Sequence, residues 1–210
     1  MLSTLAPALP DPTIPDRRIV HVTRGRGRGD IVRLMSPYDL GERLKPFVFL
    51  DLFDIKGRTI GGMPVHPHSG IATVTVLAEG DLRYDDPEQG KGTIAYGAVE
   101  WMRAGGGVWH GQELSRGTSS KVRGFQLWIA LPPELENGPV ENAYIEAGAM
   151  PQVGPAKVIL GTLQGVRSPV HAPDGIHYLL VTLAANEAWI LHVFPLEPVD
   201  ERQIARLSPT

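Results

Sequence analysis

The sequence predicts an all-β fold, a sandwich or barrel made of many short strands. The chain has 210 residues, of which 24 are glycine and 19 are proline, and these turn-forming residues are spread along it rather than gathered in one linker. Between them lie short runs rich in β-branched and aromatic residues, and no long helical pattern precedes Pro132. Short strands separated by regular turns are typical of sandwiches and barrels.

The strands follow one another in a simple order. We expect strands at 18–22 and 31–34 on either side of RGRGRGD, a solvated hairpin tip that could alternatively bind an acidic ligand. A dense apolar run, PFVFLDLFDI, then covers 46–55, and the β-branched run IATVTVLAEG covers 71–80. Further strands are expected in DLRYDD, GTIAYGAVEWMRAGGG, VRGFQLWIAL, AKVILGTLQGV, HYLLVTLAA and EAWILHVFPLE.

Composition and charge exclude several classes of function. A net charge of −3 gives no basic field that would hold nucleic acid through its phosphates, so we expect no nucleic-acid partner. No run approaches the roughly 20 apolar residues of a membrane helix, and the proline-rich start does not have the pattern of a secretory signal. We therefore expect a cytoplasmic protein. The absence of cysteine means that any metal site must use imidazole and oxygen ligands.

Two histidines stand at the entrance of the strand at 71–80. Residues two apart on a strand point to the same face, so His66 and His68 project together while Pro67 points away. Proline has no amide hydrogen, which places Pro67 at a strand start or edge. Two imidazoles on one face can share a metal ion, although ordinary polar residues at a strand entrance would give the same pattern.

A second polar cluster follows a triple glycine in AGGGVWHGQEL. His110 lies far enough after His68 for a hairpin to return its strand beside the first pair. Two such clusters, each at the end of an apolar strand, indicate one metal site with three histidines. Trp109 should then point away from the metal into packing, and Trp101 and Met102 should lie in the core.

These segments resemble a known family. GGMPVHPHSGIATVTVLAEG followed by GTIAYGAVEWMRAGGGVWHGQEL, with PFVFLDLF upstream, is similar to the N-terminal cupin domain of the pirins. The resemblance implies a cupin jelly-roll (double-stranded β-helix) barrel that holds Fe(II), with another divalent transition metal as the alternative. In the family, the ligands are two histidines of an HPH segment, a histidine after a glycine-rich turn, and a glutamate two residues beyond it. The first three correspond to His66, His68 and His110.

The fourth family ligand has no matching glutamate in this chain. Gln112 stands at that place, and strand parity turns Glu113 to the opposite face. Three arrangements are open: Gln112 binds through its carbonyl oxygen, Glu113 enters through a bulge at Gly111, or three histidines bind the metal with water. We favour the three-histidine site with Gln112 nearby. Such a site would hold Fe(II) less tightly because it lacks an anionic ligand.

The resemblance implies a quercetin 2,3-dioxygenase that uses Fe(II) and O₂ on a flavonol-like substrate. Gln112 and Glu113 are the candidate catalytic residues, because the reaction needs a group that takes the substrate proton. Gln112 is a poor base, and Glu113 could serve only in a distorted strand. Two alternatives remain: a non-catalytic regulator whose iron alters a protein-binding surface, and a degenerate cupin that binds no metal.

Three regions are expected along the chain. Residues 1–16 form an extended N-terminal arm, 17–132 the cupin domain with the metal site, and 133–210 a connector followed by a partial C-terminal cupin-like β region. The last region carries no second His-x-His segment and is short for a second barrel, so that β domain should be shortened or incomplete. Exposed strand edges would then favour pairing with another copy, which predicts a homodimer.

Overall fold

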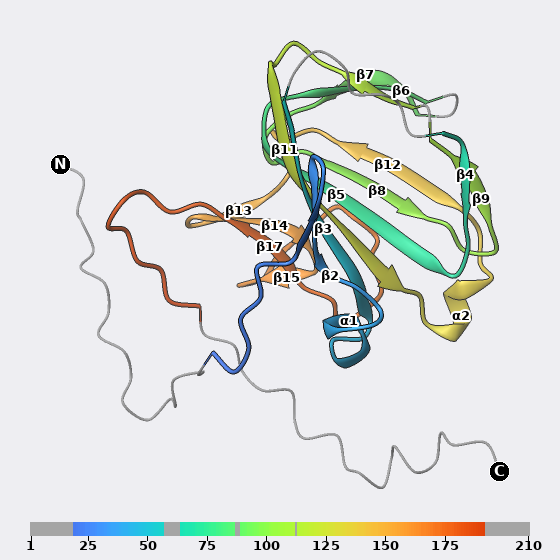
Figure 1. The fold of residues 1–210 in the computed structure, drawn as a ribbon, viewed down its shortest axis with the longest axis horizontal. Coiled ribbons are helices and arrows are strands. Elements are labelled where there is room, and N and C mark those ends of the chain that lie inside the picture. The colour runs from blue at the N-terminus through green and yellow to red at the C-terminus, as the bar shows by residue number, and fades with distance from the viewer. Residues whose placement is uncertain (1–18, 57–63, 87–88, 112, 192–210) are drawn as a thin grey trace, which may run out of the picture. The chain divides into compact units, whose positions relative to one another are not determined.

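The computed structural model describes residues 19–56, 64–86, 89–111 and 113–191 (Figure 1). The expected N-terminal arm at 1–16 lies outside these residues. The elements in the described chain are β1 (Arg26–Arg28), β2 (Ile31–Met35), α1 (Leu40–Arg43), β3 (Phe47–Lys56), β4 (His66–His68), β5 (Ile71–Glu79), β6 (Leu82–Asp86), β7 (Gly90–Ile94), β8 (Val99–Arg103), β9 (Val108–His110), β10 (Leu114–Arg116), β11 (Lys121–Ala130), α2 (Pro133–Glu136), β12 (Glu141–Ile145), β13 (Gln152–Val153), β14 (Ala156–Leu160), β15 (Thr162–Leu163), β16 (Val166–Arg167) and β17 (Tyr178–Val181).

A seven-stranded antiparallel sheet forms the framework. Its strand order is β1-β2-β3-β11-β5-β8-β12, so the long strands β11 and β5 lie near its middle (Figure 1). Smaller sheets with the orders β10-β6-β7 and β4-β9 complete this part of the molecule. The described chain is almost entirely strand and turn, and the expected all-β jelly-roll architecture is confirmed.

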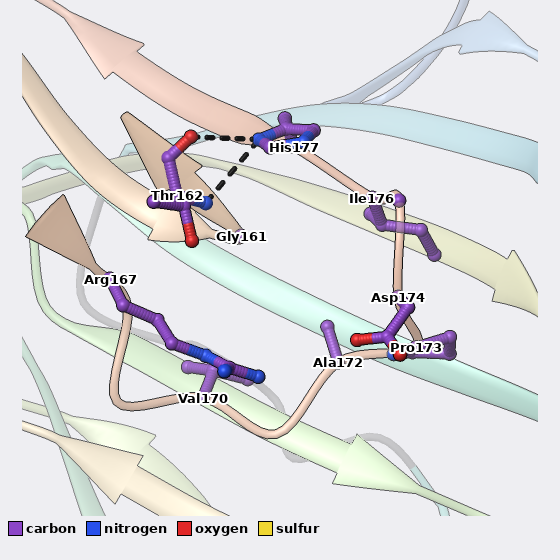
Figure 2. Close-up of a pocket in the computed structure, with 10 residues that line it drawn as sticks. Gly161, Thr162, Arg167, Val170, Ala172, Pro173, Asp174, Ile176 and His177 are labelled. Carbon is purple, nitrogen blue, oxygen red and sulfur yellow. Dashed lines mark hydrogen bonds between the residues drawn. The ribbon is translucent and has the colours of Figure 1, made fainter. Parts of the chain in front are cut away.

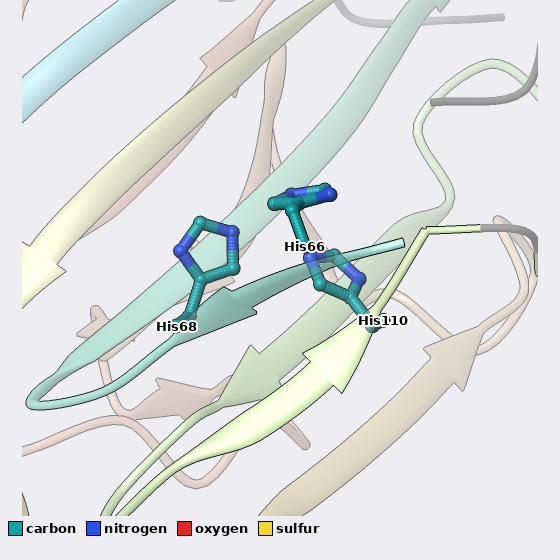
Figure 3. Close-up of side chains that lie close together, drawn as sticks. All are labelled: His66, His68 and His110. Atoms are coloured by element: carbon teal, nitrogen blue, oxygen red, sulfur yellow. The ribbon is translucent and has the colours of Figure 1, made fainter. Parts of the chain in front are cut away.

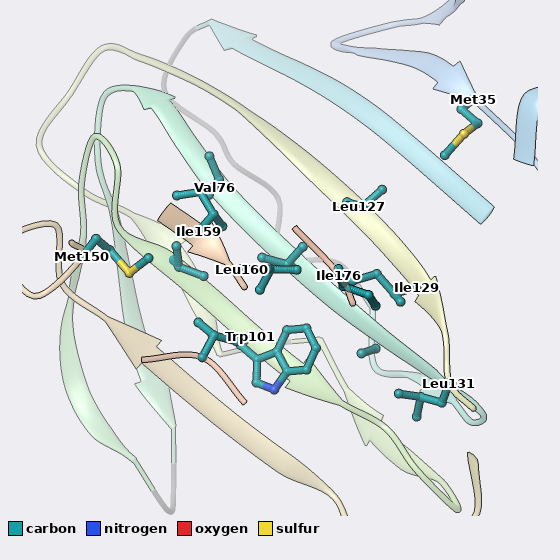
Figure 4. Close-up of a cluster of buried hydrophobic side chains, with 14 residues drawn as sticks. Met35, Val76, Trp101, Leu127, Ile129, Leu131, Met150, Ile159, Leu160 and Ile176 are labelled. Carbon is teal, nitrogen blue, oxygen red and sulfur yellow. The ribbon is translucent and has the colours of Figure 1, made fainter. Parts of the chain in front are cut away.

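The outer face of the seven-stranded sheet carries the main hydrophobic core. Leu127, Val74 and Trp101 lie opposite one another on β11, β5 and β8 and point to this face. Ile159 and Leu160 of β14 pack against it, so the short sheet β13-β14-β17 covers the framework (Figure 4). Burying each such side chain stabilises the fold by about 1.5–3 kcal/mol. The described C-terminal strands thus form a small second β layer.

The inner face of the same sheet is more polar. We use this name for the face that carries Thr75, Glu100, Gln126 and Trp128, which alternate with the core residues along β5, β8 and β11. A smaller apolar cluster that includes Leu77 joins this face to strands β6 and β7. The inner face therefore lies within the barrel, on the side of the strand pair β4-β9.

The first hairpin differs from its prediction. Residues 19–22 form no strand, and Val20 is 93% exposed. The basic glycine segment itself supplies the first strand, because Arg26–Arg28 pairs with Ile31–Arg33. Gly25 turns the chain just before the pairing begins: its φ is +69°, and a Cβ atom there would lie 2.5 Å from the carbonyl oxygen of Arg33.

The described residues up to Thr182 form one compact unit, and 183–191 belong to a second. There the backbone N–H of Ala184 donates to the Glu187 carboxylate at 2.7 Å and closes a turn. The strand expected in EAWILHVFPLE is not formed over its described part, 187–191. Nowhere in the described chain is there a helix long and apolar enough to cross a membrane.

Candidate metal centre

Strands β4 and β9 bring the three predicted histidines together. His66 and His68 project from β4, and His110 lies directly opposite His66 in the antiparallel register (Figure 3). Pro67 is paired with Trp109 on the other face of the same two strands. The alternation along a strand therefore places all three imidazoles on one side, as the His-x-His spacing predicts.

The three rings are close enough to share one ion. Their ligand nitrogens lie within 4.8 Å of one another, and the three ring centroids are 4.6–5.0 Å apart. A metal–imidazole bond is about 2.1 Å, so small rotations of the side chains would let one ion contact all three. The rings are half-buried, which leaves the site accessible from one side.

The hydrogen bonds of His66 and His110 leave ring nitrogens free to bind a metal ion. The His66 Nδ1 atom is 2.8 Å from the Pro64 carbonyl oxygen, and donation to that oxygen leaves the Nε2 lone pair free. His110 Nε2 is buried and has no hydrogen-bond partner among the described residues. A buried nitrogen without a partner is costly, and a metal ion would satisfy it.

The surroundings keep two of the imidazoles neutral. Burial lowers the pKa of His68 to about 4, with smaller contributions from His110 and His66. Burial and the nearby His66 also lower the pKa of His110, while Glu113 acts in the opposite direction. Both rings are therefore unprotonated at neutral pH and have lone pairs for a metal.

Glu113 approaches the site against the parity argument. Its carboxylate accepts the backbone N–H of Gly111 at 2.7 Å and lies 4.0 Å from His110 Nδ1. The expectation that Glu113 faces away assumed a strand that continues past His110, but β9 ends at that residue. Gln112, the other predicted ligand and catalytic residue, lies outside the described residues, and both roles stay predictions.

The remaining tryptophan and methionine predictions have mixed outcomes. Trp101 and Met102 are buried, as expected. Trp109 does point away from His110, but it is 71% exposed, so the prediction that it packs is wrong. Sequence reasoning did not find Trp128, whose ring meets His68 edge-on with centroids 4.8 Å apart. Trp128 is far from the HPH segment in the sequence, so no local pattern predicts this contact.

A separate hollow of about 190 Å³ lies among the C-terminal segments (Figure 2). Arg167, Asp174 and His177 contribute to its lining, and none of the three clustered histidines does. The His177 Nδ1 atom is 2.9 Å from the Thr162 carbonyl oxygen, so this ring is engaged by the backbone. The hollow is thus distinct from the metal centre.

Comparison with known proteins agrees with this geometry. The family model described as Pirin matches residues 29–129, which include all three histidines. Pirin-1 of Arabidopsis thaliana is 31% identical over 198 residues, covering 89% of this chain and 67% of that protein. The chain belongs to the pirin family. A pirin-like protein of Caulobacter vibrioides is 36% identical over 129 residues, covering 59% of this chain and 46% of the relative.

Solved structures are also similar to this pirin in sequence and in fold. Quercetin 2,3-dioxygenase from Acinetobacter baumannii is 30% identical with a TM-score of 0.59, covering 68% of this pirin and 54% of that chain. GK1651 from Geobacillus kaustophilus is 29% identical with a TM-score of 0.56, covering 68% and 56%. This pirin spans about half the length of curated relatives that it matches, 46% and 40% for two of them.

Proposed function

We propose that this pirin binds Fe(II) through His66, His68 and His110 and acts as a flavonol dioxygenase of the quercetin 2,3-dioxygenase type. The observation that carries the proposal is the cluster of three imidazoles with its unpartnered His110 Nε2 atom. The kinship to a quercetin 2,3-dioxygenase supports the substrate class and the use of O₂. Bound Fe(II) with open positions would supply a Lewis acid that can engage both O₂ and a substrate hydroxyl oxygen.

The chain's own residues would position the reactants. Two neutral imidazoles, His68 and His110, are ready to bind a cation without first losing protons. The Trp128 ring beside His68 offers an aromatic surface next to the metal ligands, which suits a planar polyphenol. Glu113, held by the Gly111 N–H, is the nearest described carboxylate to His110 and is the candidate acceptor of the substrate proton.

Metal content is the first test. Protein purified and loaded with Fe(II) under anaerobic conditions is expected to bind one iron per chain, and His110→Ala should lose most of that binding. The exposed His171→Ala is the matched control and should bind normally, because His171 lies outside the cluster. If wild-type protein takes up no iron during loading, the result would instead support a degenerate cupin that binds no metal.

Turnover is the second test. Fully loaded protein mixed with quercetin in oxygenated buffer should consume O₂, and His110→Ala should lose most of this activity because it removes a ligand of the metal. No O₂ consumption by fully loaded protein would exclude the dioxygenase function while leaving the metal centre intact.

A non-catalytic regulatory function is the second candidate. Trp109 is 71% exposed on the outward side of the hairpin strand that carries His110. Trp109 precedes His110 on the same strand, so metal binding at His110 would change the surroundings of this exposed ring. Tryptophan is enriched in protein interfaces. If this function holds, Trp109 fluorescence should change on iron binding in a protein that shows no flavonol turnover.

A further inference from the structure

Glu100 is a carboxylate buried inside the barrel. It lies on β8, directly opposite Thr75 of β5 and Tyr144 of β12, and is only 9% exposed. Its neighbours Val99 and Trp101 are fully buried on the other side of the strand. A charged residue in such a strand is rare unless a partner or a function retains it.

A chain of hydrogen bonds runs from Trp128, whose ring contacts His68, to Glu100. The Trp128 indole N–H donates to the side-chain oxygen of Gln126 at 3.2 Å, and the Gln126 amide donates to the Thr75 hydroxyl at 3.4 Å. The Thr75 side chain in turn bonds to Glu100. Since the Trp128 ring contacts His68, this row of inner-face side chains runs from the histidine cluster to the buried carboxylate, with each donor directed toward Glu100.

The groups around Glu100 are acidic or neutral. Burial raises the pKa of Glu100 to about 7; the hydrogen bond from Thr75 lowers it, and the charges of Glu113 and Asp86 raise it further. Burial also raises the pKa of Tyr144, so that hydroxyl is neutral. The Glu100 carboxyl group can thus hold a proton near neutral pH, unlike an exposed glutamate.

The three histidines themselves bring no negative charge to a bound divalent cation. The nearest described carboxylate is that of Glu113, 4.0 Å from His110 Nδ1. Glu113 links the two regions electrostatically, since it acts on the pKa of both His110 and Glu100. A cation at the histidines would therefore favour the ionised form of a carboxylate inside the same barrel.

We propose that Glu100 is a buried counter-charge of the metal centre, and that a divalent cation bound by the histidines displaces the proton of its carboxyl group to solvent. The bond broken is the O–H bond of the Glu100 carboxyl group, and the released proton balances one positive charge of the incoming ion. This proposal rests on metal binding by His66, His68 and His110, as proposed above. It does not depend on any oxygenase activity.

Calorimetric titration with Co²⁺ tests the coupling. Binding heats measured in buffers of different ionisation enthalpy give the number of protons released per ion. Wild-type protein should release more protons per ion than Glu100→Gln near pH 7, by a fraction of a proton up to about one, and the excess should disappear at pH values well above the pKa of Glu100. Protons displaced from the histidines are common to both proteins and cancel in this difference.

Two further variants sharpen the experiment. Glu79→Gln removes an exposed carboxylate at the end of β5 and should release as many protons as wild type. Thr75→Val keeps the side-chain shape but removes the hydrogen bond that lowers the pKa of Glu100, so its proton release should extend to higher pH. This variant tests the proposal even if Glu100→Gln fails to fold, because an unchanged pH profile in Thr75→Val would contradict it.

The outcomes separate this inference from the proposed function. Equal proton release by wild type and Glu100→Gln at every pH, with normal Co²⁺ binding, overturns the role of Glu100 and leaves the metal centre in place. Absence of Co²⁺ binding to wild type overturns the metal centre and this proposal with it. If Glu100 and the cation attract each other, Glu100→Gln should also bind Co²⁺ more weakly than wild type above pH 8. The loss of affinity should be tenfold for each unit by which the cation lowers the pKa of Glu100 in wild type.

Discussion

Trp101 and Trp109 are the same residue type in two opposite environments. Trp101 is fully buried on the outer face of β8, whereas Trp109 on β9 is 71% exposed. Replacing Trp101 by alanine removes a large buried side chain and leaves a cavity, which should lower the free energy of unfolding by about 3–5 kcal/mol. Trp109→Ala should change it by less than about 0.5 kcal/mol.

Urea denaturation followed by circular dichroism measures both effects. Both variants delete the same atoms, so the difference between their free energies of unfolding reports the difference in burial of the two tryptophans. A Trp109→Ala loss as large as that of Trp101→Ala would show that Trp109 is covered in solution, for example by another copy of the chain.

The sequence is a good guide to which residues share a face and a poor guide to what covers that face. Strand alternation correctly places His66 and His68 together with His110. It cannot show that Trp128 reaches His68, because that contact depends on how strands from distant parts of the chain are assembled. Nor does it show how Glu113 returns toward His110 once the strand has ended.

Among the elements, the turn after β5 is joined to the segment before β11 by the side chain of Asp81. Asp81 accepts the backbone N–H groups of Thr118 and Ser119, both at 2.7 Å, and bonds to the Ser119 hydroxyl. These bonds, the Ser119 hydroxyl first, lower the pKa of Asp81 to about 2. Because the folded pKa is lower than the ordinary value of 3.8, the stabilisation is complete above that value and is lost as the pH falls toward 2.

Asp81→Asn should therefore destabilise the protein by about 1 kcal/mol at pH 7, a value reduced for solvent screening at this surface site. The difference from wild type should shrink as the pH falls from about 4 to about 2. Urea midpoints measured across that range provide the test. Asp85→Asn is the control, because Asp85 makes an exposed ion pair with Lys91 and should have almost no effect. A pH-independent loss in Asp81→Asn would contradict the pKa argument.

Element boundaries show where sequence reasoning succeeds and fails. The apolar run at 46–55 becomes Phe47–Lys56, and the β-branched run at 71–80 becomes Ile71–Glu79, because buried strands have a strong pattern of their own. The first hairpin was misplaced since its register depends on turn geometry at Gly29, where φ is +62°. A strand such as Arg26–Arg28, with the sequence RGR, carries no apolar pattern from which it could be predicted.

At the scale of the whole molecule, the described part of the C-terminal segment, up to residue 191, forms short sheets and not a second barrel. Its sheet β13-β14-β17 instead covers the outer face of the seven-stranded sheet, with Ile159 and Leu160 in the main core. Short apolar strands predicted this β region, but their small number gave no information about which surface they would cover. The metal centre lies on the opposite side of the framework sheet, so this layer affects the site only through the stability of that sheet.

The homodimer predicted from the sequence has a candidate interface in this layer. Within the described chain β17 has a neighbour on one side only, which leaves backbone groups of Tyr178–Val181 available for another strand. Light scattering at micromolar concentration should then give roughly twice the chain mass of 22.8 kDa.

A lysine at Val181, which is 38% exposed, should shift the protein toward monomer because a charge at a strand edge opposes pairing. Val166→Lys on β16 is the matched control, at 36% exposure, and should remain dimeric. A wild-type monomer would refute the dimer, and a Val181→Lys dimer would exclude β17 as its interface. Because β17 belongs to the outer layer, dissociation through this edge should leave Co²⁺ binding at the histidines unchanged, which separates assembly from the metal centre.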